Sequence, residues 1–230
     1  MIVGRQGSKG LPGKNTLLVA GRPMIAHSID HACASHHIDR VIVSTDGEEI
    51  AQVARASGVE VIMRPPLLAN DQSTVDSAVR HAIESIGAPQ SIIVILYANV
   101  PVRPHGLIDR AIEHLVETGA DSVQSYEPVG KRHPWWMSRL DQGGRVVAWH
   151  RNDVYRRQDL PPVWFPDGGV IAVRRESLFN VEPESPHSFL GRDRRGIENG
   201  AGEVIDVDDE IDLMVAEAII RRDGSSQARA

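Results

Sequence analysis

Short apolar runs alternate along most of the chain with longer stretches in which apolar residues recur every three or four positions. The runs predict strands at 40–45, 59–63, 91–97 and 121–126. The longer stretches predict helices at 48–58, 73–87 and 105–119, each closed by a glycine. The run SIIVILY at 91–97 is apolar at consecutive positions, which is typical of a strand buried on both faces. This alternation predicts an α/β fold with a Rossmann-like, doubly wound and mostly parallel sheet.

Four polar loops follow the predicted strands. They are GRQGSKGLPGKN at 4–15, STDGEE at 44–49, MRPPLLANDQST at 63–74 and YANVPVRP at 97–104. Because ligands in such sheets bind at the carboxyl ends of the strands, we expect these loops to gather at one edge and form a site.

The pattern changes after residue 126, where periodicity weakens and all four tryptophans lie between 135 and 164. We interpret about 127–167 as an aromatic-rich lobe inserted into a single domain at 1–223, followed by a polar tail at 224–230. Because tryptophan and tyrosine are enriched at interfaces, we expect the lobe to make a homodimer contact. The segment GGVIAV at 168–173 predicts a strand, and 203–222 predicts a strand, an acidic turn and a closing helix.

The composition narrows the class of protein. Lys and Arg number 25 against 31 Asp and Glu, which gives a formal net charge of -6 and argues against a nucleic-acid-binding surface. The single cysteine excludes an intrachain disulfide framework and a cysteine-based zinc site. The sequence contains no apolar run long enough to span a membrane and shows no signal peptide, so we expect a cytoplasmic protein.

Positive charge is concentrated at the start of the chain, where the first fourteen residues contain Arg5, Lys9 and Lys14 and no carboxylate. The spacing matches neither a Walker loop nor a Rossmann fingerprint. Backbone N–H groups of a glycine-rich turn can still form an anion-binding concavity, and three cations suit a triphosphate better than one carboxylate. A basic surface turn is the alternative, but a position directly after the first strand favours a phosphate site.

A group of acidic residues lies near the other end of the chain. In an extended segment Asp206 and Asp208 point to the same face, and such a pair suits Mg²⁺. The alternative is a solvated acidic turn that caps the last helix, which is the role we expect for Asp209 and Asp212. For Asp46, in STDG, we expect a turn or helix N-cap role.

The loop GRQGSKGLPGKN resembles the signature loop of the CMP-sialic acid synthetases (acylneuraminate cytidylyltransferases), R-x-x-S-K-G-(I/L/V)-P-x-K-N. The resemblance continues, in the same order, through RVIVSTDGEEIA, GVEVIMRPPLLANDQST, VILYANVPVR and IDVDDEIDL. It implies a fold of the nucleotide-diphospho-sugar transferase type and a homodimer whose lobe reaches into its partner. It also implies Mg²⁺-dependent transfer of CMP from CTP to a nonulosonic sugar acid, with release of pyrophosphate.

The resemblance also implies roles for individual residues. Arg5, Lys9 and Lys14 would hold the triphosphate and the departing pyrophosphate, and Asp206 and Asp208 would bind the metal. The nucleotide site would further include backbone groups of Val3 and Gly4. Asn15, Arg64 and Ser73 would line the cytidine part of the site.

Two departures from the family pattern put the sugar site in question, and a third concerns the first strand. Tyr97 and Asn99 stand in LYANVP where the sialic acid synthetases carry LLQPTSP, and this segment is closer to the pseudaminic acid branch. Phe165 and Asp167 stand in FPDGG where the family often has FRPNG. We expect these four residues to contact the sugar and to change which groups are recognised. The first strand is also short, and we expect the natural start to lie upstream of Met1.

The leading hypothesis is a cytidylyltransferase for a sialic-acid-like 2-keto sugar acid. One alternative is a 3-deoxy-manno-octulosonate cytidylyltransferase, because LPGK recurs in that loop. A second alternative is a non-catalytic nucleotide-sugar-binding protein.

Overall fold

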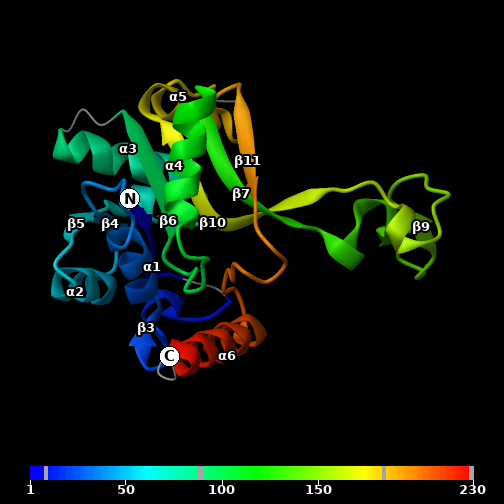
Figure 1. The fold of residues 1–230 in the computed structure, drawn as a ribbon, viewed down its shortest axis with the longest axis horizontal. Helices are drawn as coiled ribbons and strands as arrows, with labels where there is room; N and C mark the ends of the chain where they lie inside the picture. The colour runs from blue at the N-terminus through cyan, green and yellow to red at the C-terminus, as the bar shows by residue number, and fades with distance from the viewer. Residues whose placement is uncertain (8–9, 88–90, 183–184, 228–230) are drawn as a thin grey trace.

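The main sheet is mostly parallel, as the sequence predicts. A computed structural model describes residues 1–7, 10–87, 91–182 and 185–227, and within them a seven-stranded sheet has the order β11-β7-β10-β6-β1-β4-β5 (Figure 1). The strands are β1 Ile2–Val3, β4 Ile42–Thr45, β5 Glu60–Met63, β6 Ile92–Tyr97, β7 Ser122–Pro128, β10 Trp164–Arg174 and β11 Arg194–Glu198. Only β10 runs antiparallel to its neighbours, β6 and β7, because β7 and β10 are the two legs of one long hairpin-like excursion.

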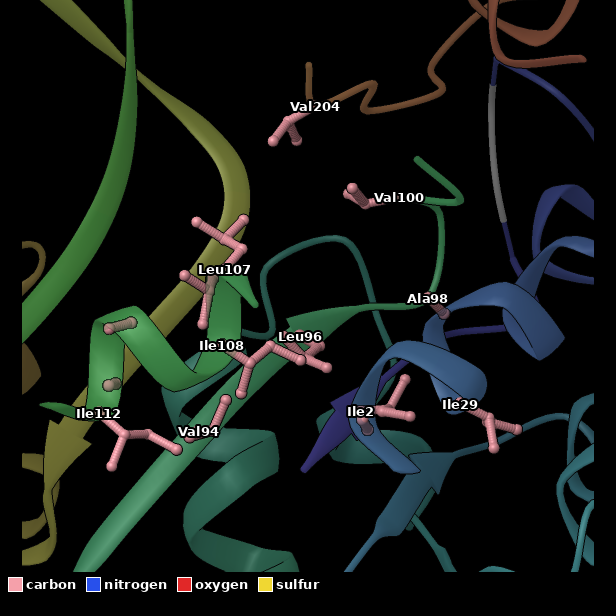
Figure 2. Close-up of a cluster of buried hydrophobic side chains, with 14 of the residues drawn as sticks. Ile2, Ile29, Val94, Leu96, Ala98, Val100, Leu107, Ile108, Ile112 and Val204 are labelled. Carbon is pink, nitrogen blue, oxygen red and sulfur yellow. The ribbon is translucent and has the colours of Figure 1, made fainter. Parts of the chain in front are cut away.

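Helices cover both faces of the sheet. One face packs against α1 Met24–Cys33, α2 Glu48–Ala56 and α4 Leu107–Thr118, through a core that includes Ile29, Leu96 and Ile108 (Figure 2). The other face packs against α3 Val75–Ile86 and α5 Arg175–Phe179. The helix predicted at 73–87 begins after Thr74, whose side chain accepts a hydrogen bond from the backbone N–H of Ser77.

The last helix packs against an early part of the chain. Helix α6, Glu210–Gln227, shares a small separate core with Leu11 of the opening loop and with β2 Leu18–Val19, which pairs with β3 Arg22–Pro23. The helix continues through residues that the sequence suggests as a polar tail. The strand predicted just before it is wrong, since residues 203–207 contribute only an isolated bridge between Ile205 and Val102.

An arm projects from the far ends of β7 and β10 (Figure 1). It carries the two-stranded sheet of β8 Ser138–Leu140 and β9 Val146–Ala148. Short 3-10 turns at Gly130–Arg132, Pro134–Trp136 and Arg157–Asp159 connect the rest of the arm. Large side chains on it stay exposed in this single chain, among them Leu140, Trp149 and Tyr155.

Strand β11 is an element that the sequence pattern does not predict. Its residues, RRGIE, are mostly polar and exposed, and it pairs in parallel with β7 at the edge of the sheet. An edge strand with charged side chains lacks the apolar alternation that identifies a buried strand, so the pairing is decided by tertiary contact.

Candidate active site

The candidate site lies where the strand order reverses, at the carboxyl ends of β1 and β6. Strand β1 pairs with β4 on one side and with β6 on the other, so the loops that leave β1 and β6 diverge at this point. Two cavities of about 290 Å³ and 200 Å³ open there, and Tyr97 at the end of β6 lines both of them. A molecule with two distinct halves could therefore occupy adjoining spaces on either side of Tyr97.

The larger cavity collects the predicted nucleotide residues. It is lined by Val3, Gly4, Arg5, Lys14, Asn15, Arg64, Ser73, Tyr97 and Asn99, together with Gly7, Asp71 and neighbours from the loop before α3. Lys9, which the resemblance places among the phosphate ligands, lies outside the described residues. Glycine is required at position 4, because an added Cβ would lie 2.8 Å from the Cβ of Ala98.

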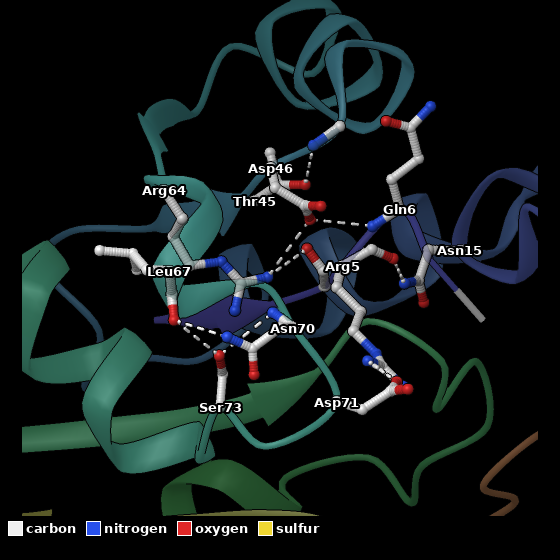
Figure 3. Close-up of polar contacts among 12 residues, drawn as sticks. Arg5, Gln6, Asn15, Thr45, Asp46, Arg64, Leu67, Asn70, Asp71 and Ser73 are labelled. Atoms are coloured by element: carbon white, nitrogen blue, oxygen red, sulfur yellow. Dashed lines mark hydrogen bonds and ion pairs between the residues drawn. The ribbon is translucent and has the colours of Figure 1, made fainter. Parts of the chain in front are cut away.

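Hydrogen bonds hold the opening loop against the neighbouring strand ends. The Asn15 side chain donates to the Arg5 carbonyl at 2.8 Å, and the Arg64 guanidinium donates to the Gly4 carbonyl at 2.7 Å (Figure 3). The backbone N–H of Gln6 donates to the Asp46 carboxylate at 2.9 Å. The expected capping role of Asp46 is therefore wrong: helix α2 begins after Gly47 without a side-chain cap, and Asp46 anchors the opening loop instead.

Two buried polar atoms beside this cavity have no hydrogen-bond partner among the described residues. They are the Nε of Arg64, a donor, and the Oδ1 of Asn15, an acceptor. The Arg64 side chain is only 7% exposed, and its desolvation lowers the pKa of the guanidinium. An unpaired buried polar atom is unfavourable, and no described group satisfies either of these two.

Both described cations of the opening loop are paired with carboxylates. Arg5 Nη1 lies 2.7 Å from Asp71 Oδ1, and Lys14 Nζ lies 2.8 Å from Asp208 Oδ1 (Figure 3 shows the first pair). The Lys14 side chain is 13% exposed, whereas that of Asp208 is 77% exposed. Each of these two cations thus already binds a negatively charged oxygen, the kind of atom that a phosphate also presents.

The acidic segment has the alternation that the sequence predicts. Val207 is fully buried, and Asp206 and Asp208 on either side of it are exposed on one face. The Asn99 side chain donates to Asp206 Oδ1 and, at 3.2 Å, to the Val207 carbonyl. Although Asp206 keeps an exposed edge, the surrounding protein removes water from its carboxyl group. This desolvation, strengthened by Asp208, raises the pKa of Asp206 to about 6, against the opposing charges of Lys14 and Arg103.

The neighbouring carboxylates serve the helix, as expected. Asp209 Oδ1 accepts the backbone N–H groups of Ile211 at 2.8 Å and of Asp212 at 3.0 Å. The Asp212 side chain accepts in return from the backbone N–H groups of Asp208 and Asp209. This reciprocal cap fixes the start of α6 and, with it, the direction of the Asp206–Asp208 segment.

The smaller cavity is lined by Tyr97, Gln124, Ser125, Phe165, Pro166, Gly168, Val170, Ile171 and Asp206. Two of the predicted sugar residues, Tyr97 and Phe165, therefore line it. Asn99 lines the larger cavity and holds Asp206. Burial raises the pKa of the Tyr97 hydroxyl, so Tyr97 is a neutral donor and acceptor there.

Asp167 is not part of either cavity wall. It is 7% exposed, its Oδ1 accepts from Ser125 Oγ and from the backbone N–H of Gly169 at 2.8 Å, and its Oδ2 accepts from the Asn199 side chain at 2.7 Å. Asp167 is thus an internal brace of the turn at 168–169, and its expected contact with the sugar stays a prediction.

Sequence reasoning missed Asp71 and Gln124, which line the two cavities. Asp71 lies in a loop that the sequence predicts to form part of the site, but its spacing does not distinguish it from its neighbours. Gln124 lies within a predicted strand, and only the sheet order brings that strand to the cavity. Among the described helices, none is both long and apolar enough to cross a membrane.

Comparisons with known proteins agree with this geometry. A family model described as cytidylyltransferase matches residues 1–162. The chain is 36% identical over 180 residues to an N-acylneuraminate cytidylyltransferase of Streptococcus agalactiae serotype III, an alignment that covers 77% of this chain and 43% of that protein. It is 31% identical over 235 residues to a CMP-N,N'-diacetyllegionaminic acid synthase of Legionella pneumophila, covering 96% of this chain and 94% of that protein.

A solved structure gives the same fold at lower sequence identity. The structure of a CMP:2-keto-3-deoxy-manno-octonic acid synthetase complexed with CTP superposes with a TM-score of 0.73 at 19% identity, covering 96% of this chain and 97% of that one. The chain spans less than half of the streptococcal relative, whereas it matches nearly all of the Legionella relative. With a family model over residues 1–162 and these relatives, the chain belongs to the cytidylyltransferase family.

Proposed function

We propose that the protein transfers CMP from CTP to the anomeric hydroxyl of a nonulosonic, sialic-acid-like 2-keto sugar acid and releases pyrophosphate. The observation that carries this proposal is the pair of adjoining cavities that share Tyr97. Arg5 and Lys14 line the larger cavity, and Asp206 lines the smaller one, with Asp208 paired to Lys14. Cations for phosphates and carboxylates for a metal thus converge where a nucleotide and an acceptor would meet.

In this proposal the chain's own residues act mainly by positioning and by stabilising charge, as phosphoryl-transfer chemistry requires. Arg64, Asn15 and Ser73 line the wall that would receive the nucleoside. Arg5 and Lys14 hold the triphosphate and retain the departing pyrophosphate after the sugar hydroxyl attacks the α-phosphorus. Lys9 would join them from the same loop.

The residues present fit a Mg²⁺ ion. Asp206 and Asp208 supply hard carboxylate oxygens on one face of their segment. Asp208 is also paired with Lys14, one of the proposed phosphate ligands. Mg²⁺ commonly takes one or two protein carboxylates and completes its shell with phosphate oxygens and water. When bound, Mg²⁺ would neutralise phosphate charge and ease ionisation of the attacking hydroxyl.

A panel assay tests the function. Pyrophosphate release from CTP is measured with N-acetylneuraminic, legionaminic and pseudaminic acids and with 3-deoxy-manno-octulosonate. We expect turnover with at least one nonulosonic acid. The absence of pyrophosphate release with all three nonulosonic acids refutes the proposal. Asp208→Asn should abolish turnover, while Glu210→Gln, an exposed acid two residues further on, should leave it intact. CTP binding without turnover would favour a non-catalytic nucleotide-sugar-binding protein.

We also propose that the protein works as a homodimer through the arm. Leu140, Trp149 and Tyr155 are 70%, 60% and 94% exposed in the single chain, and a run of large exposed apolar side chains on one projection is typical of an interface. Light scattering should give the mass of two chains for the wild type. Trp149→Asp should shift that equilibrium towards one chain, and a wild type that is monomeric at all concentrations contradicts the proposal.

A further inference from the structure

Arg103 is a buried cation to which no role has so far been given. It lies in the loop between β6 and α4 and is 6% exposed. Its Nε donates to the Gly169 carbonyl at 2.6 Å, and its Nη2 donates to the Tyr97 carbonyl at 3.0 Å. Its Nη1 donates to the Val100 carbonyl and, at 3.0 Å, to Ser28 Oγ. The guanidinium therefore joins three separate segments: the loop after β6, the turn before the buried part of β10, and helix α1.

The burial of this side chain is energetically unfavourable. Within the described residues no carboxylate lies within ion-pairing distance of Arg103, and its partners are carbonyls and a hydroxyl. Desolvation lowers the pKa of the guanidinium to about 9, although the charges of Asp206 and Asp167 partly oppose this fall. A buried charge without a paired carboxylate is rarely the most stable way to fill a core position. A role in shaping the neighbouring site would account for it.

The segments that Arg103 holds are the walls of the smaller cavity. Tyr97 and Gly168, which is adjacent to Gly169, both line that cavity. They also pack closely, because a Cβ added at Gly168 would lie 3.3 Å from Asp206 Oδ2 and 3.5 Å from the Tyr97 ring. A shift of either segment by an ångström would therefore change the shape of this cavity.

The loop that contains Arg103 is also hydrogen-bonded to the acidic segment around Asp206. The backbone N–H of Val207 donates to the Asn99 carbonyl at 2.9 Å, and that of Ile205 donates to the Val102 carbonyl at 3.3 Å. These two bonds flank Asp206 on both sides. The loop at 97–103 is thus the support on which Asp206 rests, and Val100 at its middle is fully buried in the core (Figure 2).

We propose that Arg103 is a positioning residue for the acceptor half of the site, because it fixes Tyr97, Gly168 and Asp206 relative to one another. This proposal rests on the proposed function for its kinetic consequences but not for its structural ones. Arginine suits the task because its planar fork offers five N–H donors at fixed angles, of which four are used here. Lysine has a single point of attachment and could hold only part of this arrangement.

The chain offers a matched control on β10, the strand whose Gly169 carbonyl Arg103 binds. Arg174, at the other end of β10, also donates to backbone carbonyls, those of Ala120 at 2.8 Å and Leu115 at 3.5 Å. Arg174 is not among the residues that line either cavity. Replacement of Arg174 should therefore remove the same kind of hydrogen bond, from a guanidinium to backbone carbonyls, without affecting the site.

The test compares Arg103→Met, Arg103→Lys and Ser28→Ala with Arg174→Met. Hydrogen exchange of the unliganded proteins is followed in peptides covering 97–103 and 166–170. We expect at least tenfold faster exchange there in Arg103→Met, a partial effect in Arg103→Lys and Ser28→Ala, and no change in Arg174→Met. Unchanged exchange in Arg103→Met, or faster exchange throughout the protein, overturns the positioning role whether or not the enzyme turns over.

Kinetics provide the second readout. In Arg103→Met we expect the KM for the sugar acid to rise at least tenfold. The KM for CTP should rise by a smaller factor, because Tyr97 also lines the nucleotide cavity. Arg103→Lys should recover part of the loss, and Arg174→Met should alter neither constant. Equal increases in both KM values would show a general structural role and overturn the proposal. A wild type that turns over no sugar acid defeats the proposed function alone, since the exchange experiment still decides the role of Arg103.

Discussion

The ion pair between Arg5 and Asp71 leads to the first prediction. Arg5 Nη1 and Asp71 Oδ1 are 2.7 Å apart, and both residues line the larger cavity. If Arg5 binds the triphosphate, a phosphate oxygen competes with Asp71 for the same guanidinium. Replacement of Asp71 with Asn removes the competing charge and nearly preserves the shape of the side chain. We therefore expect Asp71→Asn to bind CTP more tightly, with little change in kcat.

The magnitude follows from the exposure of the pair. The two side chains are 39% and 51% exposed, so the attraction acts largely through water and is partly screened. Two unit charges 2.7 Å apart in water attract by about 1.5 kcal/mol, and exposed pairs retain roughly 0.2–1 kcal/mol in measurements. Since 1.4 kcal/mol is a factor of ten in affinity, the KM for CTP should fall by up to about fivefold.

Initial rates of pyrophosphate release against CTP concentration, at low and at high salt, provide the assay. The gain in Asp71→Asn should shrink at high salt, because screening already weakens the pair in the wild type. Glu60→Gln is the matched control: Arg40 and Glu60 lie 2.6 Å apart with exposures of 36% and 51%, away from both cavities. It should leave the KM for CTP unchanged. A higher KM in Asp71→Asn would refute the reasoning and show instead that Asp71 orients Arg5 for the phosphate.

Further predictions concern the metal pair and the local backbone. The pKa of Asp206 is raised to about 6, so its carboxylate takes up a proton as the pH falls through that value. Turnover at limiting Mg²⁺ should then decline below about pH 6, and a pH profile that does not move with Mg²⁺ concentration contradicts this. Gly168 has a φ of 75°, which costs an L-residue about 1–2 kcal/mol. Gly168→Ala should lower Tm and raise the KM for the sugar acid, whereas Gly202→Ala, at a φ of 77° in open space, should lower Tm alone. Asp209→Ala removes the cap of α6 and should cost about 1 kcal/mol in thermal or denaturant unfolding; an unchanged Tm would show that the cap is dispensable.

The sequence was sufficient where chemistry and periodicity are local. The run at 91–97 specifies a buried parallel strand because every one of its positions after Ser91 is apolar, and β6 is that strand. The helix at 73–87 is specified by its apolar face, its Thr74 cap and its final glycine. The two-residue spacing of Asp206 and Asp208 sets them on one face because side chains alternate in extended backbone, and the buried Val207 between them agrees.

Tertiary structure decided what depends on distant partners. Asp46 could cap a helix or anchor a loop, and it anchors the loop because Gln6, forty positions away, presents a backbone N–H to it. Asp167 could face a ligand or the interior, and it faces the interior because Ser125 and Asn199 satisfy its oxygens. The pairing of Lys14 with Asp208 depends on α6 packing against the opening loop. Local sequence fixes which groups a segment offers and on which face, but the fold of the whole chain determines which groups meet.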